Sequence, residues 1–583
     1  MFGNIINSTG SKIYVLNKTH KVLLNYKEVH VVFDEGNHKF VGQIDNVTED
    51  SFSISILGEI INNKYQSGFF KGPKENTIPR IINGYELSLI IGKQDLNDNG
   101  TLLIGKSVLY PNFNVTAKLD TFFSNHFAII GNSGSGKSCG AARILQNLFY
   151  SKIPPKNAHI VLFDAYGEYD NAFSKLSSIP QINYRSYKNS TLDEANGISI
   201  PPYFLDADSL AILLDIDDSN LIPILEKTLQ YVNVFKSNTP KSAEYKNNIL
   251  ASSILEILLS GKKASQIRDQ ILSILNKFGT NEINESSEIK ELGYSRTLKQ
   301  CLNLDGDGKI NDISKVIDFL NNYKKLNISK YDVTADITYN LEDIYDALDF
   351  ALLSEGIYTN SKMYESSSVL KTHLYQIINS PFKKYFVYND IISKEEYIRR
   401  MFLTKSNEEA QIINISLDSL DDRLAKILTK LYSKIFFEYV TSLSNRGSFP
   451  INIILEEAHR YVNDDKDRIV LGYNIFDRIT KEGRKYGLLM GFITQRPSEL
   501  SQTSLSQCSN FLVFRLFHPE DYNMIDRITN GLTNDSLDRL KNLRNGVALA
   551  FGNAFSVPFL VSIDLPDPLP LSNNVKISNT WYN

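Results

Sequence analysis

The sequence has few cysteines, little net charge and no long apolar run. Its 583 residues include only three cysteines, which are widely separated and form no C-x-x-C pair. This pattern excludes a disulfide framework and a cysteine zinc site, so we expect a reducing, cytoplasmic compartment. No stretch approaches the roughly 18 consecutive apolar residues of a membrane span. The first residues, MFGNIINSTGSKIYV, also lack the basic start and apolar core of a signal peptide, so we expect no membrane association.

The composition is that of a folded protein with more than one domain. Hydrophobic residues make up 42% of the chain and charged residues 22%, and a chain of this length is expected to form about two to four domains with real cores. The formal net charge of -4 gives no basic field over the whole surface. A nucleic acid could therefore bind only at a local basic patch or inside an assembly.

Two stretches satisfy the phosphate-loop pattern G-x-x-x-x-G-K-[ST], and they lie close together in the chain. The first, GTLLIGKS at 100–107, has bulky, β-favouring residues between its glycines. We interpret it as a strand followed by a loop at the edge of an N-terminal barrel. A phosphate loop needs small residues whose N–H groups converge on an anion, with a helix directly behind them.

The second stretch, GNSGSGKS, meets both requirements. The apolar run HFAII before it predicts a buried strand, and CGAARILQNLFY after it predicts a helix. We therefore assign ATP binding to Gly131, Asn132, Ser133, Gly134, Ser135, Gly136, Lys137 and Ser138. In this assignment Lys137 reaches the β- and γ-phosphates, and the hydroxyl of Ser138 is a ligand of Mg²⁺.

A pair of acids supplies the second half of the expected site. The apolar run INIIL at 451–455 predicts a strand that ends in Glu456 and Glu457. We predict that Glu456 binds the Mg²⁺ and that Glu457 is the general base for the attacking water. The alternative is that both glutamates only cap the N-terminus of a helix.

Two further candidates follow the acids. Gln495 comes directly after the apolar run LLMGFIT, at a strand end where parallel-sheet sites form, and is a candidate γ-phosphate sensor. A simple turn after the strand is the alternative. Arg484 and Lys485 lie next to a glycine at a predicted helix end, where they either cap the helix or supply an arginine finger.

Five ordered motifs together resemble the HerA family of the HerA/FtsK group of hexameric DNA-translocating ATPases. The motifs are HFAIIGNSGSGKS at 126–138, DAYGEY at 164–169, LEEAH at 455–459, EGRKYG at 482–487 and TQRPS at 494–498. Weaker similarity continues through LSQCSN at 505–510 and LRNGVALAFG at 543–552. About two thirds of the chain is covered by the resemblance.

The resemblance implies several properties that the residues alone do not. It implies a RecA-like core, a homo-hexamer with ATP at the subunit interfaces, and DNA in the central pore. It implies that Arg484 acts on the site of a neighbouring subunit and that Asp164 is catalytically important. Without the resemblance, Asp164 is a turn residue at a strand end. HerA-like proteins are associated with separate effectors, either nucleases or sirtuin-like NAD-hydrolysing enzymes, in DNA-end processing or antiviral defence.

We therefore predict an α/β fold, with a RecA-like P-loop ATPase core, a small N-terminal β-barrel and a large helical insertion. The expected segments are the barrel at 1–115, the two parts of the core at 116–204 and 406–565, the insertion at 205–405, and a C-terminal tail at 566–583. The barrel is predicted from the alternation in SFSISI at 51–56 and from short apolar runs separated by turn residues. The insertion is predicted because the phosphate loop and the acids are much farther apart than one strand-helix crossover requires.

The insertion and the tail each leave an alternative open. We expect helices at 209–235, interrupted near Asp215 and Pro223, and an apolar helix face at 267–275. The stretch NLDGDGKI at 303–310 begins like a calcium-binding EF-hand loop, but Ser314 stands where the bidentate glutamate belongs, which favours a solvated turn. The proline-rich tail ends near the single tryptophan and either docks on a neighbouring subunit or stays free.

Three classes of function are compatible with these features. The first is a ring motor that pulls DNA through its pore, and the second is an ATPase scaffold that organises a separate effector. The third is a protein-remodelling ring or a nucleotide-sensing switch, for which the sequence offers no feature beyond the ATPase core. No nuclease-like cluster or Ser-His-Asp set is visible outside the ATPase motifs, so cleavage chemistry would have to come from a partner.

Overall fold

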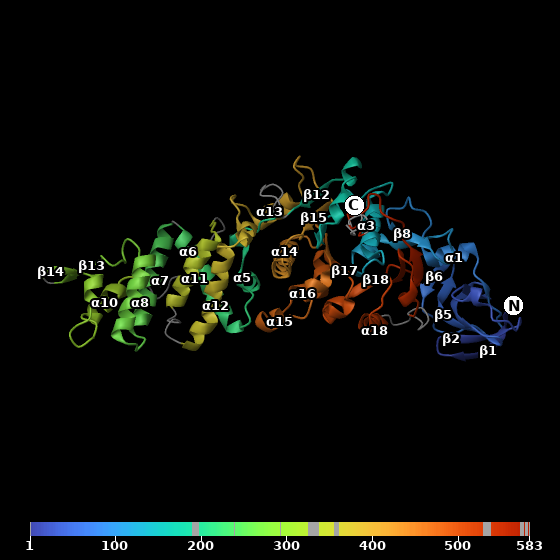
Figure 1. The fold of residues 1–583 in the computed structure, drawn as a ribbon, viewed down its shortest axis with the longest axis horizontal. Helices are drawn as coiled ribbons and strands as arrows, with labels where there is room; N and C mark the ends of the chain where they lie inside the picture. Colours follow the sequence, from blue (N-terminus) through green and yellow to red (C-terminus); the bar gives the residue numbers. More distant parts are fainter. Residues whose placement is uncertain are drawn as a thin grey trace. The chain divides into compact units, whose positions relative to one another are not determined.

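The computed structural model describes residues 2–188, 198–237, 239–291, 293–324, 337–354, 361–528 and 538–571, together with Ile577 and Trp581 (Figure 1). The chain forms two compact units. The first contains residues 1–197, 395–464 and 474–583, and the second contains residues 198–394 and 465–473. The candidate ATPase residues all belong to the first unit.

An 11-stranded sheet is the centre of the first unit. Its parallel part runs in the order β12 (Tyr184–Tyr187), β15 (Ile412–Ser416), β11 (Ile160–Asp164), β16 (Ile451–Glu456), β17 (Leu488–Thr494), β10 (His126–Ile130) and β18 (Cys508–Val513). Antiparallel strands continue it with β19 (Val547–Gly552), β20 (Phe559–Ser562), β8 (Thr101–Ser107) and β9 (Asn114–Lys118). The central parallel strands are continuous apolar runs because both faces of this part of the sheet are buried.

Helices cover both faces of this sheet. Leu162 of β11 belongs to the apolar cluster formed with α3 (Lys137–Phe149) and α4 (Tyr169–Phe173). The next residue, Phe163, instead lies 6.3 Å, between ring centroids, from Tyr432 of α14 (Asp422–Ser442). Because successive strand residues point to opposite faces, α3 and α14 lie on opposite sides of the sheet. Other helices of this unit are α2 (Leu119–Phe123), α13 (Lys394–Met401, whose first residue belongs to the second unit), α16 (Ile475–Glu482), α17 (Gln502–Ser506) and α18 (Pro519–Ile528).

The first phosphate-loop look-alike is a strand, as predicted. Residues 101–107 form β8, which pairs with β9 and β20. A side chain at Gly105 would lie 2.3 Å from the carbonyl oxygen of Ser562, so the close approach to β20 explains this glycine. The expected location was wrong, however, because β8 belongs to the 11-stranded sheet and not to the sheet of the N-terminal strands.

The N-terminal strands form a separate antiparallel sheet of seven strands. Its order is β1 (Phe2–Thr9), β2 (Lys12–Asn17), β5 (Ser51–Ile61), β4 (His38–Val47), β3 (His30–Glu35) and β7 (Arg80–Ile81), and β6 (Lys64–Ser67) pairs with β5. Bulges interrupt the pairing of β4 with β5, and an apolar cluster that includes Val15, Phe33 and Phe52 fills one side of the sheet. Among the described residues the strand order is open, with β1 and β7 at its ends, where we expected a barrel.

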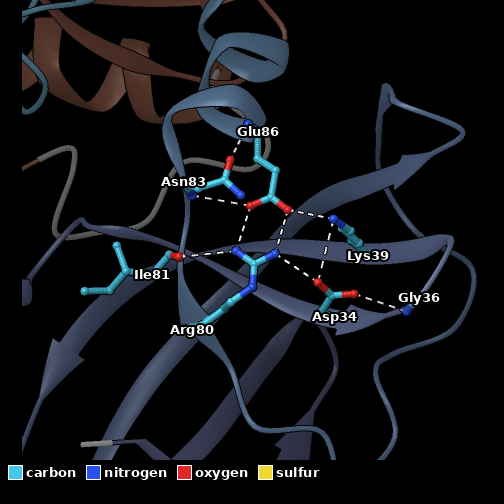
Figure 2. Close-up of polar contacts among 7 residues, drawn as sticks. All are labelled: Asp34, Gly36, Lys39, Arg80, Ile81, Asn83 and Glu86. Carbon is cyan, nitrogen blue, oxygen red and sulfur yellow. Dashed lines mark hydrogen bonds and ion pairs between the residues drawn. The ribbon is translucent and has the colours of Figure 1, made fainter.

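A buried glutamate joins this sheet to α1 (Gly84–Ile91). The Glu86 carboxylate accepts hydrogen bonds from Arg80 at 2.6 and 2.8 Å and from Lys39 at 2.8 Å, and Arg80 also contacts Asp34 at 2.9 Å (Figure 2). Asn83 caps the helix by accepting the Glu86 N–H at 2.8 Å, and the Glu86 side chain accepts the Asn83 N–H in return. Hydrogen bonding by Arg80 lowers the pKa of Glu86 from 4.5 to about 2.

We expect this glutamate to stabilise the N-terminal sheet in a pH-dependent way. Because the folded-state pKa is below the unfolded value, the stabilisation is complete above pH 4.5 and is lost as the pH falls toward 2. The shift corresponds to roughly 3 kcal/mol. Glu86→Gln should therefore lower the unfolding temperature of this part at pH 7 in a calorimetric scan, and the difference should disappear near pH 2. Glu75→Gln, at an exposed position, is the control, and an equal effect of both variants would contradict the assignment.

The second unit is mainly helical, as predicted for the insertion. Its helices are α5 (Ala207–Leu214), α6 (Ile222–Lys236), α7 (Pro240–Leu258), α8 (Ala264–Phe278), α9 (Leu298–Cys301), α10 (Ile313–Asn321), α11 (Leu341–Ser354), α12 (Ser361–Ile378) and α15 (Asp467–Val470), and β13 (Glu288–Glu291) pairs with β14 (Tyr294–Thr297). The expected interruption lies at Asp215, which ends α5 in a left-handed conformation. The EF-hand look-alike is a turn in which Asp305 accepts the N–H groups of Asp307 and Lys309, both at 2.9 Å.

The described part of the C-terminal tail docks on its own ATPase core. The Gln146 side chain, fully buried in α3, accepts the Asp567 N–H at 2.9 Å and donates to the Pro568 carbonyl at 3.0 Å. Farther along, the Leu571 N–H donates to the Glu168 carbonyl at 2.8 Å. The tail therefore crosses α3 and reaches the loop after β11. Docking of its end on a neighbouring subunit stays a prediction, and most residues after 571 lie outside the described part.

Candidate active site

The loop 131–136 between β10 and α3 is held by backbone contacts on three sides. The Gly131 N–H donates to the Thr494 carbonyl at 3.1 Å, and the Asn132 N–H donates to the Arg515 carbonyl at 3.0 Å. The carbonyl of Ser135 accepts the Gly546 N–H at 2.9 Å. The loop is thus fixed between the end of β17, the end of β18 and the turn before β19.

Glycine is required where this loop enters α3. Gly136 is the N-cap residue, with a φ of 99° that favours glycine, and a Cβ there would lie 2.8 Å from the Gly546 nitrogen. The small residues of GNSGSGKS therefore allow both the left-handed turn and the close contact with the neighbouring loop. Bulky residues such as those of GTLLIGKS could not take this path.

The loop presents polar groups that have no partner among the residues that the structure describes. The first N–H groups of α3 have no acceptor inside the helix, because the helical hydrogen bonds begin with Gly140 donating to Gly136. The hydroxyl of Ser135 is buried and has no hydrogen-bond partner among the described residues. These groups and the positive end of the helix dipole suit a phosphate chain.

Lys137 contacts one of the two predicted acids. Its ammonium lies 3.2 Å from the Glu457 Oε1, and both side chains are buried. The Glu457 Oε2 is also buried and makes no hydrogen bond among the described residues, although the His459 Nδ1 lies 3.3 Å away. A buried carboxylate with a free oxygen has capacity for a further donor, such as a water molecule.

The backbone of Glu457 is strained. Its φ is 48°, in the left-handed region, directly after the end of β16. It starts a short 3-10 helix without making a side-chain capping bond, so the capping alternative does not explain the side chain. Strain of this kind is found where a functional side chain must be aimed.

The other acid, Glu456, lies beside Asp164. The Glu456 Oε2 accepts the Ala165 N–H at 3.1 Å, and the side chain is buried. Burial raises the pKa of Glu456 well above its usual range, the negative charge of Asp164 raises it further, and Lys137 acts in the opposite direction. A site that gathers this much negative charge favours a cation.

Asp164 is the last residue of β11 and holds the turn that follows it. Its carboxylate accepts the N–H groups of Tyr166, Glu168 and Tyr169 at 2.9 to 3.3 Å, and the Asn414 side chain donates to it at 3.2 Å. Asp164 is fully buried. Its geometry is that of the strand-end turn residue that the sequence suggests without the family resemblance. Its charge also acts on the neighbouring Glu456, an interaction that the sequence did not reveal.

Gln495 reaches the phosphate loop. Its Oε1 accepts the Ser133 hydroxyl at 2.6 Å, although 362 positions separate the two residues. The preceding Thr494 accepts the Arg496 N–H at 3.0 Å through its hydroxyl, which also lies 3.1 Å from His459. His459 thus links Glu457 to the end of β17. It belongs to the LEEAH stretch, where the sequence alone indicates no role for it.

Arg484 lies at the amino-terminal ends of the parallel strands, opposite to the ends that carry the phosphate loop. It belongs to a 3-10 turn (Gly483–Tyr486) just before β17, whereas the phosphate loop follows the end of the parallel strand β10. Burial, with a smaller contribution from the charge of Arg484, lowers the pKa of His126, the first residue of β10, to about 4. The exposed Arg484 side chain has no hydrogen-bond or ion-pair partner among the described residues. With about 3.3 Å per strand residue, Arg484 lies roughly 20 Å from its own phosphate loop.

Comparison with known proteins finds similarity to one family of helicases. Residues 102–330 match the family model described as the central domain of helicase HerA. The chain is similar to HerA helicases. The DNA double-strand break repair helicase HerA of Pyrococcus furiosus is 24% identical over 476 residues, 81% of this chain and 70% of its own length. The HerA helicase of Sulfolobus acidocaldarius is 23% identical over 518 residues, 87% of this chain and 77% of its own length.

Solved structures also align with most of this chain, with TM-scores below 0.5. The plasmid coupling protein TrwB, in complex with the non-hydrolysable GTP analogue GDPNP, aligns over 85% of this chain and 95% of its own, with 10% identity and a TM-score of 0.44. VirB4 of Thermoanaerobacter pseudethanolicus aligns over 80% of this chain and 97% of its own, with 12% identity and a TM-score of 0.41.

The HerA matches confirm two predictions from the sequence, the resemblance to the HerA family and the assignment as an ATPase. Within the described residues, no helix has both the length and the apolar character needed to cross a membrane.

Proposed function

We propose that this protein is an ATP-driven motor that translocates DNA. One observation carries the proposal. The glycine loop, Lys137, the acids Glu456 and Glu457, and Gln495 converge at one edge of a parallel sheet, next to a helix N-terminus. This is the arrangement needed to hold a triphosphate and activate a water molecule at its end.

Each side chain has a role in ATP hydrolysis. Lys137 exchanges its contact with Glu457 for the β- and γ-phosphates, which leaves Glu457 to accept a proton from the attacking water. Gln495 senses the γ-phosphate from its position beside Ser133. Mg²⁺ would be held by Ser138 and Glu456 together with phosphate oxygens, and would neutralise charge on the phosphates. Asp164 positions Glu456 by fixing the turn that donates to it.

Arg484 acts on a neighbouring subunit in this proposal. It is exposed, and it lies at the sheet edge opposite to its own phosphate loop, so it cannot reach its own nucleotide. A homo-hexameric ring would bring Arg484 of one subunit to the γ-phosphate bound by the next, where it would stabilise charge in the transition state.

The DNA substrate is proposed from the HerA relatives, which are named as DNA double-strand break repair helicases. DNA would pass through the central pore of the ring, in the cytoplasm. We also propose a separate effector enzyme, either a nuclease or a sirtuin-like NAD-hydrolysing protein, in DNA-end processing or antiviral defence. The alternative is a ring that acts mainly as a scaffold or nucleotide-sensing regulator of that partner.

A triplex-displacement assay separates motor from scaffold. Movement along double-stranded DNA should release a third strand at a rate that depends on ATP, and DNA should stimulate ATP hydrolysis. A scaffold would hydrolyse ATP without displacing the strand. The Glu457→Gln variant is the control, because it should bind DNA and ATP without moving along the DNA. ATP-dependent release by that variant would contradict the motor mechanism.

The two acids should give different defects. Glu457→Gln should bind ATP and keep the assembly but hydrolyse about 100-fold more slowly or worse, because the attacking water loses its base. Glu456→Gln should instead weaken Mg²⁺-dependent nucleotide binding. Titration calorimetry and single-turnover hydrolysis measure the two effects separately. Equal rate losses with unchanged affinities would contradict the division of roles.

A further inference from the structure

The segment after β18 has a fixed position beside the phosphate loop. It reads FRLFH at 514–518, and the Phe514 N–H donates to the Ile130 carbonyl at 2.7 Å. The Phe514 ring lies beneath the loop, where a Cβ at Gly131 or Gly140 would contact its side chain at 2.6 Å. The Arg515 carbonyl holds the Asn132 N–H. The backbone of this segment is therefore anchored directly to the residues that hold phosphate.

The second phenylalanine of the segment, Phe517, is exposed. Phe514 and Leu516 are buried, whereas the intervening Arg515 is partly exposed and Phe517 is 59% exposed. The Arg515 guanidinium lies 5.0 Å from the centroid of the Phe517 ring. Its Nη1 donates to the Leu543 carbonyl at 3.4 Å, while its Nε is buried without a partner among the described residues. An aromatic ring with a cation beside it thus lies next to the nucleotide loop.

The direction of a bound nucleotide follows from the order of the strands. Glu457 and Gln495 follow β16 and β17, which lie on one side of the phosphate-loop strand β10. The γ-phosphate must lie on that side. The α-phosphate and the nucleoside must then extend toward β18 and β19, on the other side of β10, where the turn at 543–546 lies. Phe517 is linked to this turn through Arg515, which contacts both the Leu543 carbonyl and the Phe517 ring.

From this geometry we propose that Phe517 is the stacking platform for the purine base of the nucleotide, with Arg515 supporting the ring. The inference rests on the proposed ATPase function and deepens it by assigning the base subsite. A flat aromatic surface recognises the face of a base and not its hydrogen-bonding edge. The subsite therefore prefers purines over pyrimidines because they stack more strongly, and it discriminates weakly between adenine and guanine.

Inorganic tripolyphosphate, which has no base, tests the assignment. In calorimetric titrations with Mg²⁺, Phe517→Ala should weaken binding of a non-hydrolysable ATP analogue about 5- to 100-fold. Its affinity for tripolyphosphate should not change, and Phe517→Trp should retain the affinity of the wild type for the analogue. Phe70→Ala, at another exposed phenylalanine, is the matched control and should change neither affinity.

The outcomes separate this inference from the function on which it rests. Equal weakening of both ligands by Phe517→Ala would mean that the ring only supports the loop, and unchanged affinity for the analogue would mean that it does not touch the base. Either result overturns the inference and leaves the ATPase assignment intact. If the wild type binds neither ligand, the proposed function fails as well. Mass photometry of each variant checks that assembly is unchanged, and a loss of assembly without a change in affinity would place Phe517 in a subunit contact instead.

Discussion

Lys137→Ala should abolish ATP hydrolysis, with a loss of about 100-fold or more in the turnover rate. Lys137 is the buried cation at the start of α3, where the loop glycines and the free helix N–H groups converge. Without it, the phosphates lose their charged contact, and the Glu457 carboxylate is left buried without its partner. Phosphate release at saturating ATP is the measurement, and a thermal scan establishes that the variant is folded.

The look-alike sequence supplies the matched control. Lys106→Ala changes the same residue type within the same sequence pattern, but Lys106 is an exposed residue of β8. Its turnover should stay within a few-fold of wild type. A folded Lys106→Ala protein without activity would refute the division between the two stretches.

Arg484→Ala should reduce turnover by about 1,000-fold if the arginine acts as a finger across an interface. The side chain is exposed and lies at the amino-terminal edge of the parallel strands, away from its own phosphate loop. Lys481→Ala, at an exposed position on the preceding helix α16, should have little effect. Steady-state hydrolysis measures both variants, and wild-type turnover of Arg484→Ala would return this residue to the capping role.

Mixed assemblies test whether Arg484 acts on its neighbour. Co-expressing Arg484→Ala with Glu457→Gln subunits places an intact arginine opposite an intact base at some interfaces. Part of the activity missing from each variant alone should return, whereas an arginine that serves its own subunit allows no such rescue. Mass photometry verifies the mixed assemblies, and a stable monomer with full activity would contradict the requirement for a ring.

Local chemistry was sufficient to predict the conformations of the two look-alike stretches. The left-handed Gly136 and its close contact with Gly546 require glycine, which GNSGSGKS provides, whereas the bulky residues of GTLLIGKS favour a strand. The paired acids and Gln495 were predicted from strand ends, because the carboxyl ends of parallel strands meet at one edge of a sheet. The interruption at Asp215 and the helical nature of the second unit were also readable from hydrophobic periodicity.

Only the tertiary structure determined which distant residues contact one another. Lys137 and Glu457 are 320 positions apart, and no local pattern specifies that their side chains meet. The placement of β8 in the ATPase sheet depends on its pairing with β20, near the other end of the chain. The open order of the N-terminal sheet and the contact of Arg515 with Asn132 likewise depend on long-range packing. A sequence pattern specifies the conformation of a segment and the face that it buries, but the partner of that face is decided when segments far apart in the chain pack together.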